Sequence, residues 1–208
     1  VLGVDGYYSN NGGSTWAKKM DAYDSKTSKE TYVHPDYHFA EFMDANNVLV
    51  GHDGGVGLIN ISTQPFGHTD ITGNMIIGQI YHAAIYNSDL NNENLLLGMQ
   101  DNDGYSKSPT TKSGNWVAVS AGDGTAAGIN HRDPLIRFMG GVHGALHRTK
   151  TAYLASYTDQ TEVIAPNEST APFICEVIIH DQNPNHVFAG HGELKYSKDA
   201  GLTFQDVG

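Results

Sequence analysis

The residues best suited to chemistry in this chain are His34, Asp36 and His38, which alternate along the stretch HPDYH. In an extended strand, residues i, i+2 and i+4 point to the same side. Two imidazoles and a carboxylate would then share a face, and this ligand set suits zinc or another transition metal. The alternative is that the three side chains hydrogen-bond neighbouring loops and stabilise the beginning of a strand, because no fourth ligand is evident nearby.

Two acidic stretches have a spacing that is found in calcium loops. DNDG, at residues 101–104, offers Asp101 and Asp103, but it lacks the downstream bidentate glutamate of an EF-hand loop. Asp and Asn before Gly are also typical of tight turns. GDG, at residues 122–124, leaves the same two interpretations open, and its Asp123 comes just before an expected strand. The sequence therefore allows either calcium or plain turns here.

Hydrolysis of a glycosidic bond would need two carboxyl groups about 5 to 10 Å apart, one of them with a raised pKa. Asp36 and Asp123 are candidates for these roles. Further acids are present at Glu41, Asp53, Asp101 and Glu176. Because no two of these acids stand in a recognisable catalytic motif, a hydrolase stays the second hypothesis.

The composition limits the partners that the chain can have. Its 208 residues include 23 acidic and 12 basic ones, which gives a formal charge of −11. This balance argues against nucleic acid and anionic membranes, since phosphate binding needs a basic surface. Calcium or neutral glycans suit the charge better. No apolar run reaches the roughly 18 residues of a membrane span, so no membrane insertion is expected. Cys175 is the only cysteine, and its apolar surroundings indicate a buried residue rather than a nucleophile.

The elements that must position these side chains are short strands. Gly is frequent, with 24 residues, and apolar alternation is interrupted by turn residues, which indicates an all-β protein. Four segments, beginning at residues 38, 82, 126 and 175, share one pattern: a strand, a turn, a second strand and a closing glycine. The closing glycines are Gly51, Gly98, Gly140 and Gly190, and Gly3 continues the series. Their spacing of 42 to 50 residues is typical of β-propeller blades.

An eight-residue formula recurs at the two ends of the chain, as SNNGGSTW and SKDAGLTF. We expect each copy to form a hairpin turn, in which Asn or Asp accepts backbone hydrogen bonds, Gly adopts a positive φ and the aromatic residue packs. The structural residues of the formula are Ser9, Asn11, Gly13, Thr15 and Trp16, and Ser197, Asp199, Gly201, Thr203 and Phe204. NISTQPF at 60–66 and SGNW at 113–116 read as decayed copies.

The formula S-x-[DN]-x-G-x-T-[WF] resembles the Asp-box, or BNR repeat, of sialidase-like β-propellers. The stretches HPDYH, VLVGHDGGV, GQIYHAAIYN and LLLGMQDND are similar to those of large secreted propellers of the sortilin-like or xyloglucanase-like type. The resemblance implies a secreted or cell-surface protein, with the octapeptide between the third and fourth strands of a blade. The distribution of arginines argues against a sialidase, because Arg132, Arg137 and Arg148 are the only ones and all fall in one predicted blade.

The predicted fold is therefore an all-β propeller of four-stranded antiparallel blades. At about 45 residues per blade, residues 1–208 would form one segment of about four to five blades that starts and ends in mid-blade. Such a segment is either a small ring or part of a longer propeller whose remaining blades are its partner. We expect a binding site at the mouth of the central channel, formed by His34, Asp36, His38, His82 and Asp123.

The function expected from these features is non-catalytic and extracellular: a binding or scaffolding module for glycan or protein ligands. Aromatic side chains such as Tyr81 would contribute contacts with a ligand. The alternative is part of a xyloglucanase-like glycoside hydrolase with an incomplete catalytic set. A third hypothesis is a propeller stabilised by zinc or calcium at His34, Asp36 and His38.

Overall fold

The computed structural model describes residues 3–22, 33–86, 94–107, 116–150 and 160–207. Residues 113–115 of the SGNW stretch lie outside the described residues. The chain divides into two compact units, Val1–Ile77 and Gly78–Gly208, and each is considered by itself. Regular structure in the described residues is β, apart from one 3-10 turn, η1 (Val142–Gly144). The expectation of an all-β chain is therefore confirmed for the part of the chain described.

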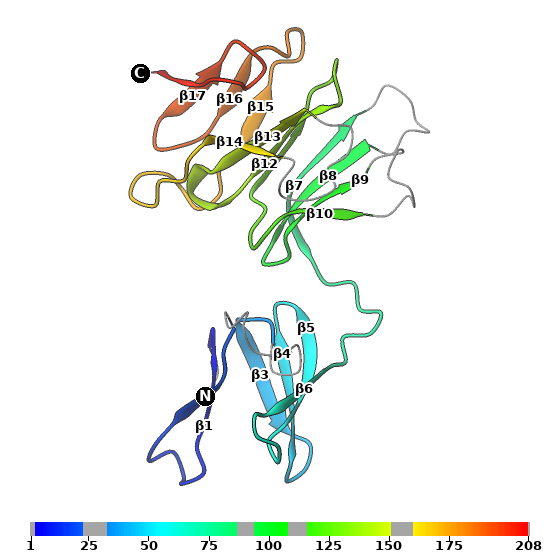
Figure 1. Ribbon diagram of the computed structural model, residues 1–208, viewed down its shortest axis with the longest axis vertical. Helices are drawn as coiled ribbons and strands as arrows, with labels where there is room; N and C mark the ends of the chain where they lie inside the picture. The colour runs from blue at the N-terminus through cyan, green and yellow to red at the C-terminus, as the bar shows by residue number, and fades with distance from the viewer. Residues whose placement is uncertain (1–2, 23–32, 87–93, 108–115, 151–159, 208) are drawn as a thin grey trace. The chain divides into compact units, whose positions relative to one another are not determined.

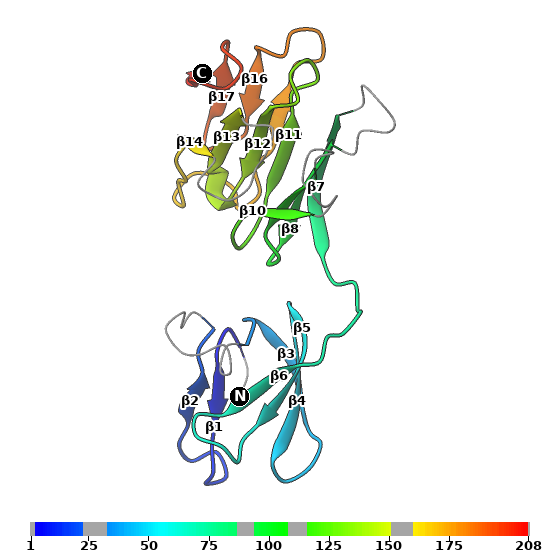
Figure 2. The same ribbon diagram turned by 45° about the vertical axis from the view of Figure 1, so that its right-hand side comes forward.

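The first unit contains a two-stranded and a four-stranded antiparallel sheet. The strands are β1 (Gly6–Tyr8) and β2 (Ala17–Met20), then β3 (Tyr37–Phe42), β4 (Asn47–His52), β5 (Gly55–Asn60) and β6 (Gly67–Asp70). The core of the unit is built on Val33, Val50, Ile59 and Phe66, against which Tyr8 of β1 packs. The β1–β2 hairpin consequently lies beside one face of the β3–β6 sheet (Figure 2).

The second unit contains three four-stranded antiparallel sheets, each built from strands that are consecutive in the sequence. The first has β7 (Gln79–Tyr86), β8 (Asn94–Gln100), β9 (Gly104–Lys107) and β10 (Val117–Ser120). The second has β11 (Ala126–Ile129), β12 (Ile136–Gly140), β13 (Leu146–Lys150) and β14 (Thr161–Ile164). The third has β15 (Val177–Ile179), β16 (Val187–Ala189), β17 (Leu194–Ser197) and β18 (Gln205–Val207). The predicted four-stranded antiparallel sheets are thus confirmed.

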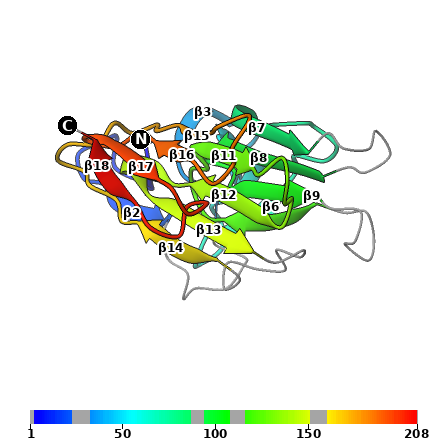
Figure 3. The same cartoon turned by 90° about the horizontal axis from the view of Figure 1, so that it is seen from above.

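The three sheets of the second unit pack face to face in sequence order, with the β11–β14 sheet in the middle (Figures 1 and 3). The first strand of the middle sheet, β11, contacts both β7 and β15, the first strands of its neighbours. One apolar cluster, with Leu96 and Met139, fills the space on one side of the middle sheet. The other side is filled by a cluster with Phe138 and Val187. Burial between faces is therefore what joins the sheets of this unit.

Four of the five glycines of the predicted period occupy similar places in four sheets, whereas Gly3 lies before β1 and outside any strand. Gly51, Gly98 and Gly140 lie in the second strand of their sheets, and Gly190 directly follows the second strand β16. Gly51 and Gly98 each pair with the first-strand residue that follows a bulge, Phe39 on β3 and His82 on β7. A Cβ at position 98 would come within 2.3 Å of the carbonyl oxygen of Gly124, so the close approach of two backbones explains this glycine.

The first octapeptide forms the hairpin turn between β1 and β2. The hydroxyl oxygen of Ser9 accepts a hydrogen bond from the Gly13 N–H at 2.9 Å, and the Asn11 Oδ1 accepts one from the Thr15 N–H at 3.0 Å. Gly13 has a φ of 87°, as predicted. Trp16, however, is 48% exposed, so its packing is incomplete.

The second octapeptide connects β17 to β18, which are the third and fourth strands of their sheet. Its hydrogen bonds repeat those of the first: Ser197 Oγ accepts from the Gly201 N–H at 2.8 Å, and Asp199 Oδ1 accepts from the Thr203 N–H at 2.9 Å. Phe204 packs against the apolar cluster around Phe138. The stretch at 60–66 likewise lies between the third and fourth strands of its sheet, β5 and β6.

Candidate functional site

The structure does not place His34, Asp36 and His38 on one face of a strand. Strand β3 begins only at Tyr37, and Asp36 has a φ of 61°, in the left-handed region. The alternation rule requires extended backbone throughout, so it does not apply to this stretch. The expectation of a shared strand face is therefore wrong, while metal binding by these residues stays a prediction.

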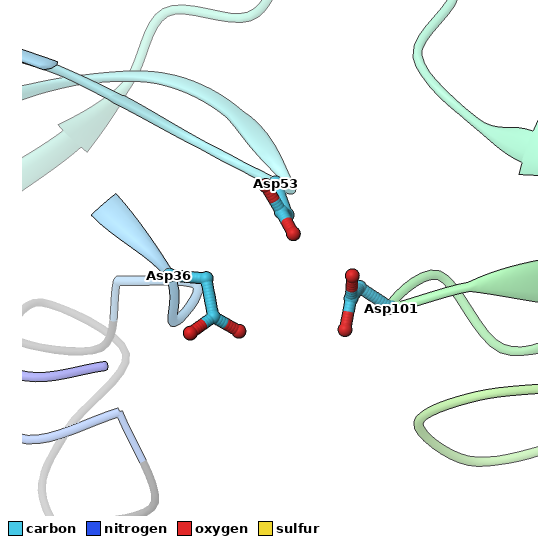
Figure 4. Close-up of side chains that lie close together, drawn as sticks. All are labelled: Asp36, Asp53 and Asp101. Carbon is cyan, nitrogen blue, oxygen red and sulfur yellow. The ribbon is translucent and has the colours of Figure 1, made fainter. Parts of the chain in front are cut away.

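Each of these side chains instead lies near the end of β4 or the turn that follows it. The His34 ring stacks on the His52 ring, with centroids 5.8 Å apart. His38, which occupies a bulge of β3, faces Asp53 through its Nε2. A carboxylate oxygen of Asp36 lies within 4.8 Å of one of Asp53, and Figure 4 shows both side chains near this turn. The sequence alone gave no role to Asp53 beyond that of an available acid.

His52 is a neutral imidazole at physiological pH. Its pKa is lowered to about 4, first because burial disfavours the charged ring and then because His34 and His68 are nearby. Neither ring nitrogen of His52 has a hydrogen-bond partner among the residues that the structure describes. The ring therefore acts as a packing element under His34 rather than as a cationic binding group.

In the second unit, His82 connects three sheets at the end where their first strands begin. Its Nδ1 lies 2.5 Å from the carbonyl oxygen of Thr125, which directly precedes β11. Its Nε2 lies 3.6 Å from a carboxylate oxygen of Glu176, which directly precedes β15. The Glu176 side chain is 68% exposed, so this group is open to a ligand. Groups near the beginnings of the three first strands therefore lie together in this unit, while a binding site at the mouth of a channel stays a prediction.

Two acidic turns lie near Tyr81, the residue before His82. The Asp123 Oδ1 accepts a hydrogen bond from the Asp101 N–H at 3.1 Å, and the Asp103 Oδ1 accepts one from the Gly122 N–H at 2.9 Å. Asp101, the residue of this unit labelled in Figure 4, and Asp103 both have positive φ angles, of 53° and 63°. DNDG and GDG therefore both form turns, which was one of the two interpretations of these stretches. Calcium binding, the other interpretation, stays a prediction.

We call the group formed by Tyr81, His82, Asp101, Asp123 and Glu176 the polar edge. Tyr81 occupies the bulge in β7, where the register shifts beside His82. Burial raises the pKa of the Tyr81 phenol, and the negative charges of Asp123 and Asp101 raise it further. The phenol consequently stays protonated and can donate a hydrogen bond, while the carboxylates around it accept them.

The carboxyl groups with displaced pKa values are not suited to general acid catalysis. Those of Asp44, Asp70 and Asp199 are all lowered, chiefly by hydrogen bonds from Asn47, Thr72 and Thr203, respectively. A glycosidase acid needs the opposite shift.

The three arginines have structural contacts. Arg137 is buried and donates to Ser106 Oγ at 2.6 Å and Asn94 Oδ1 at 2.7 Å, so it joins the middle sheet to the β7–β10 sheet. Arg148 donates from Nε to the carbonyl of Ala200 at 2.7 Å. Both side chains therefore contribute to the packing between sheets.

The sequence pattern proposed His82 and Asp123 for the binding site, whereas it offered Tyr81 only as a surface aromatic residue and Glu176 only as an available acid. Glu176 is the residue after Cys175, where the fourth repeated segment begins. This position next to a segment start was the sequence signal that could have indicated it. Cys175 itself is buried, and burial raises the pKa of its thiol, as expected of a structural cysteine. The bulge that presents Tyr81 has no local sequence signature.

Comparisons with known proteins give fold-level likenesses only. No protein-family model matches the chain, and no curated protein matches it. Among solved structures, it is similar to the extracellular domain of a proposed hybrid two-component system, BT3049, from B. thetaiotaomicron, with 12% identity and a TM-score of 0.42, over 93% of this chain and 26% of that one. A second likeness is to the extracellular domain of a proposed one-component system, BT4673, from the same organism, with 11% identity and a TM-score of 0.40, over 93% and 25% of the two chains. The chain thus spans about a quarter of the length of these structures.

Among the residues described, no helix combines the length and the apolar character that a membrane crossing requires.

Proposed function

We propose that this chain is a non-catalytic, extracellular binding module with β-propeller architecture, and that the polar edge binds a neutral glycan. Residues 1–208 would form one segment of the propeller, with its further blades as a partner. The extracellular assignment rests on the resemblance of the two octapeptides to the Asp-box.

The propeller architecture is supported by the order and contacts of the sheets. Three consecutive four-stranded sheets pack face to face, and their first strands β7, β11 and β15 are neighbours in that order. Radial packing of blades around an axis produces this arrangement of first strands. The equivalent glycines, such as Gly98 and Gly140, are what a repeated blade would require.

The observation that carries the binding assignment is the position of His82, whose ring lies between the Thr125 carbonyl and the Glu176 carboxylate. Groups from three sheets therefore converge on one exposed edge. Tyr81 supplies a protonated phenol beside Asp101 and Asp123. Hydroxyl-rich ligands need this mixture of acceptors and donors, together with an aromatic face.

The test is binding of the full chain to an array of neutral plant and mucin oligosaccharides, followed by calorimetry with the best binder. We expect His82→Ala and Glu176→Gln each to weaken binding about tenfold, because each removes a hydrogen-bonding group worth about 1.4 kcal/mol. Glu162→Gln is the matched control. Glu162 also lies beside a histidine, with 4.0 Å between its Oε2 and the Nε2 of His147, but on the fourth strand β14.

Unchanged affinity in both polar-edge variants would show that the glycan binds elsewhere and would refute the assignment. Release of reducing sugar, lost in Asp123→Asn, would favour the hydrolase alternative instead. A third outcome is that no oligosaccharide binds but a protein ligand is captured, and that His82→Ala abolishes this capture. The polar edge would then be the binding site, but for a protein rather than a glycan. Metal binding at His34, Asp36 and His38 is a separate proposal, tested by elemental analysis for zinc and calcium.

A further inference from the structure

The first unit contains a cavity that is separate from the residues predicted for the channel mouth. Its volume is about 220 Å³, and it lies between the β1–β2 hairpin and the β3–β6 sheet. Val50, Ile59 and Phe66 form its buried walls, and Trp16 and Phe42 line it nearer to solvent, with 48% and 65% of each residue exposed. The cavity therefore has apolar walls and aromatic groups at its opening.

The register of the sheet explains why apolar side chains collect here. Val48 pairs with Ile59 across β4 and β5, and Ala40 pairs with Val50 across β3 and β4. Directly paired residues project from the same face of a sheet, so these side chains form one continuous apolar surface. Trp16 from the first octapeptide reaches the edge of this surface without filling it.

One positive charge lies at the cavity. Lys19 lines it, with its Nζ 5.6 Å from the centroid of the Phe66 ring and 3.4 Å from Gln64 Oε1. Its neighbour Lys18 is occupied by ion pairs with Asp21 at 2.7 Å and Asp5 at 3.3 Å. Among the described residues, no carboxylate lies within ion-pair distance of Lys19, whose hydrogen bond goes to the neutral side chain of Gln64.

From this combination we infer that the cavity binds a small aromatic monocarboxylate, with the ring between the apolar walls and the carboxylate on Lys19. The volume is below the about 300 Å³ at which sites for drug-sized ligands begin, and it suits about ten non-hydrogen atoms. A ring with a short acidic side chain, such as phenylacetate, meets this size. The aromatic walls favour a flat ring over an alkyl chain because ring edges and faces attract each other. The inference is independent of the glycan proposal, which concerns residues of the other unit.

The test uses the full chain titrated with phenylacetate and with phenylacetamide, which has the same size and no charge. Binding is followed by chemical-shift changes in two-dimensional NMR spectra. We expect phenylacetate to bind about tenfold more tightly than phenylacetamide, with the largest shifts at Trp16, Lys19 and Phe66. Lys19→Gln should remove this preference and leave weak binding of both compounds, whereas Lys18→Gln, on the adjacent residue, should preserve it.

A second variant tests the cavity itself. Ala40 lines the cavity, and Ala40→Phe should fill it and abolish binding of both compounds, while Phe39→Ala, on the neighbouring residue that does not line it, should leave binding unchanged. Spectra of each variant without ligand establish that the fold is retained. Equal affinity for the acid and the amide in the unmodified chain, retention of the preference in Lys19→Gln, or no binding at millimolar concentrations would each overturn the inference.

Discussion

The two octapeptides have the same backbone turn, but their surroundings differ. In both turns the Ser oxygen accepts a hydrogen bond from the Gly N–H, at 2.9 Å for Ser9 and 2.8 Å for Ser197. Ser197 is 1% exposed and Gly201 is buried against the ring of Phe138, whereas Ser9 is half-buried and Gly13 is exposed. The same local chemistry thus exists once inside a packed interface and once near the surface.

The aromatic residue that ends each copy shows the same contrast. Phe204 packs against the apolar cluster between the second and third sheets of its unit. Trp16 is about half exposed and lines a cavity. The eight residues therefore determine a turn through contacts among themselves, while the neighbouring sheet determines whether the turn contributes to the core.

The largest difference between the two turns is expected when Gly13 and Gly201 are each replaced by alanine. Both have a positive φ, 77° for Gly201 and 87° for Gly13, so alanine at either position costs about 1 to 2 kcal/mol of backbone strain. At Gly201 the new Cβ would also lie 2.3 Å from the Phe138 ring, and such overpacking costs a further ~1–3 kcal/mol. Gly201→Ala should therefore lower the free energy of unfolding much more than Gly13→Ala.

Chemical denaturation gives the free energies, and hydrogen exchange of peptides covering 6–20 and 194–207 locates the loss. A Cβ at Gly13 would meet only the Trp16 ring, at 3.5 Å, which is ordinary contact. Equal destabilisation by the two substitutions would mean that backbone strain alone determines the cost, and the contrast in packing would have no energetic meaning.

A smaller difference is expected for the serines. Ser197→Ala leaves the buried Gly201 N–H without its acceptor, which costs about 1 to 3 kcal/mol. Ser9→Ala exposes the Gly13 N–H to water, which can replace the hydroxyl, so the cost should stay below about 1 kcal/mol. Thermal unfolding of the two variants measures both values. A Ser9 variant as unstable as the Ser197 variant would contradict the comparison.

The smallest expected difference between the two turns is in the pH dependence of stability, because the second copy has the titratable residue Asp199 where the first has Asn11. Hydrogen bonds from the Thr203 hydroxyl and N–H, and then from the Ser197 hydroxyl, lower the pKa of Asp199 from 3.8 to about 2. The folded-state pKa lies below the unfolded one, so this stabilisation is present above about pH 4 and is lost as the pH falls through about 2. Its size is limited by exposure to solvent.

Asp199→Asn, which copies the first octapeptide, should flatten the pH dependence of unfolding between pH 4 and 2 relative to the unmodified chain. Urea titrations at several pH values measure this difference. Asn11→Asp is the reciprocal variant and should introduce a similar dependence in the first copy. An unchanged slope in Asp199→Asn would show that other carboxylates account for the acid sensitivity of the fold.

Much of the fold could be predicted because the signals for it are local and repeated. The closing glycines Gly51, Gly98, Gly140 and Gly190 marked the second strands; close backbone contacts explain Gly98 and Gly140, whereas a Cβ at Gly51 or Gly190 would meet its neighbours at 3.4 Å or more. The alternating apolar residues between them gave the strands. The division into two compact units had no such signal, because it depends on which surfaces are buried together.

The candidate site was predicted less well. His82 and Asp123 were proposed because the repeated pattern placed strand starts near them, although β7 begins at Gln79, three residues before His82. Tyr81 was not assigned to the site, since a bulge in β7 depends on pairing with β8 and leaves no trace in its own residues. The shared face expected for His34, Asp36 and His38 required an extended backbone, and the positive φ of Asp36 shows that the backbone is not extended there.

By itself the sequence determined the strands, the turns and the place of each glycine, because those depend on contacts between residues a few positions apart. The tertiary structure decided which of the two matching turns is buried, which carboxylate lies beside His82, and where a cavity remains next to Trp16. Those outcomes depend on the faces that separate sheets present to one another, and pairs of residues as distant as His82 and Glu176 carry no mark of their proximity in the chain.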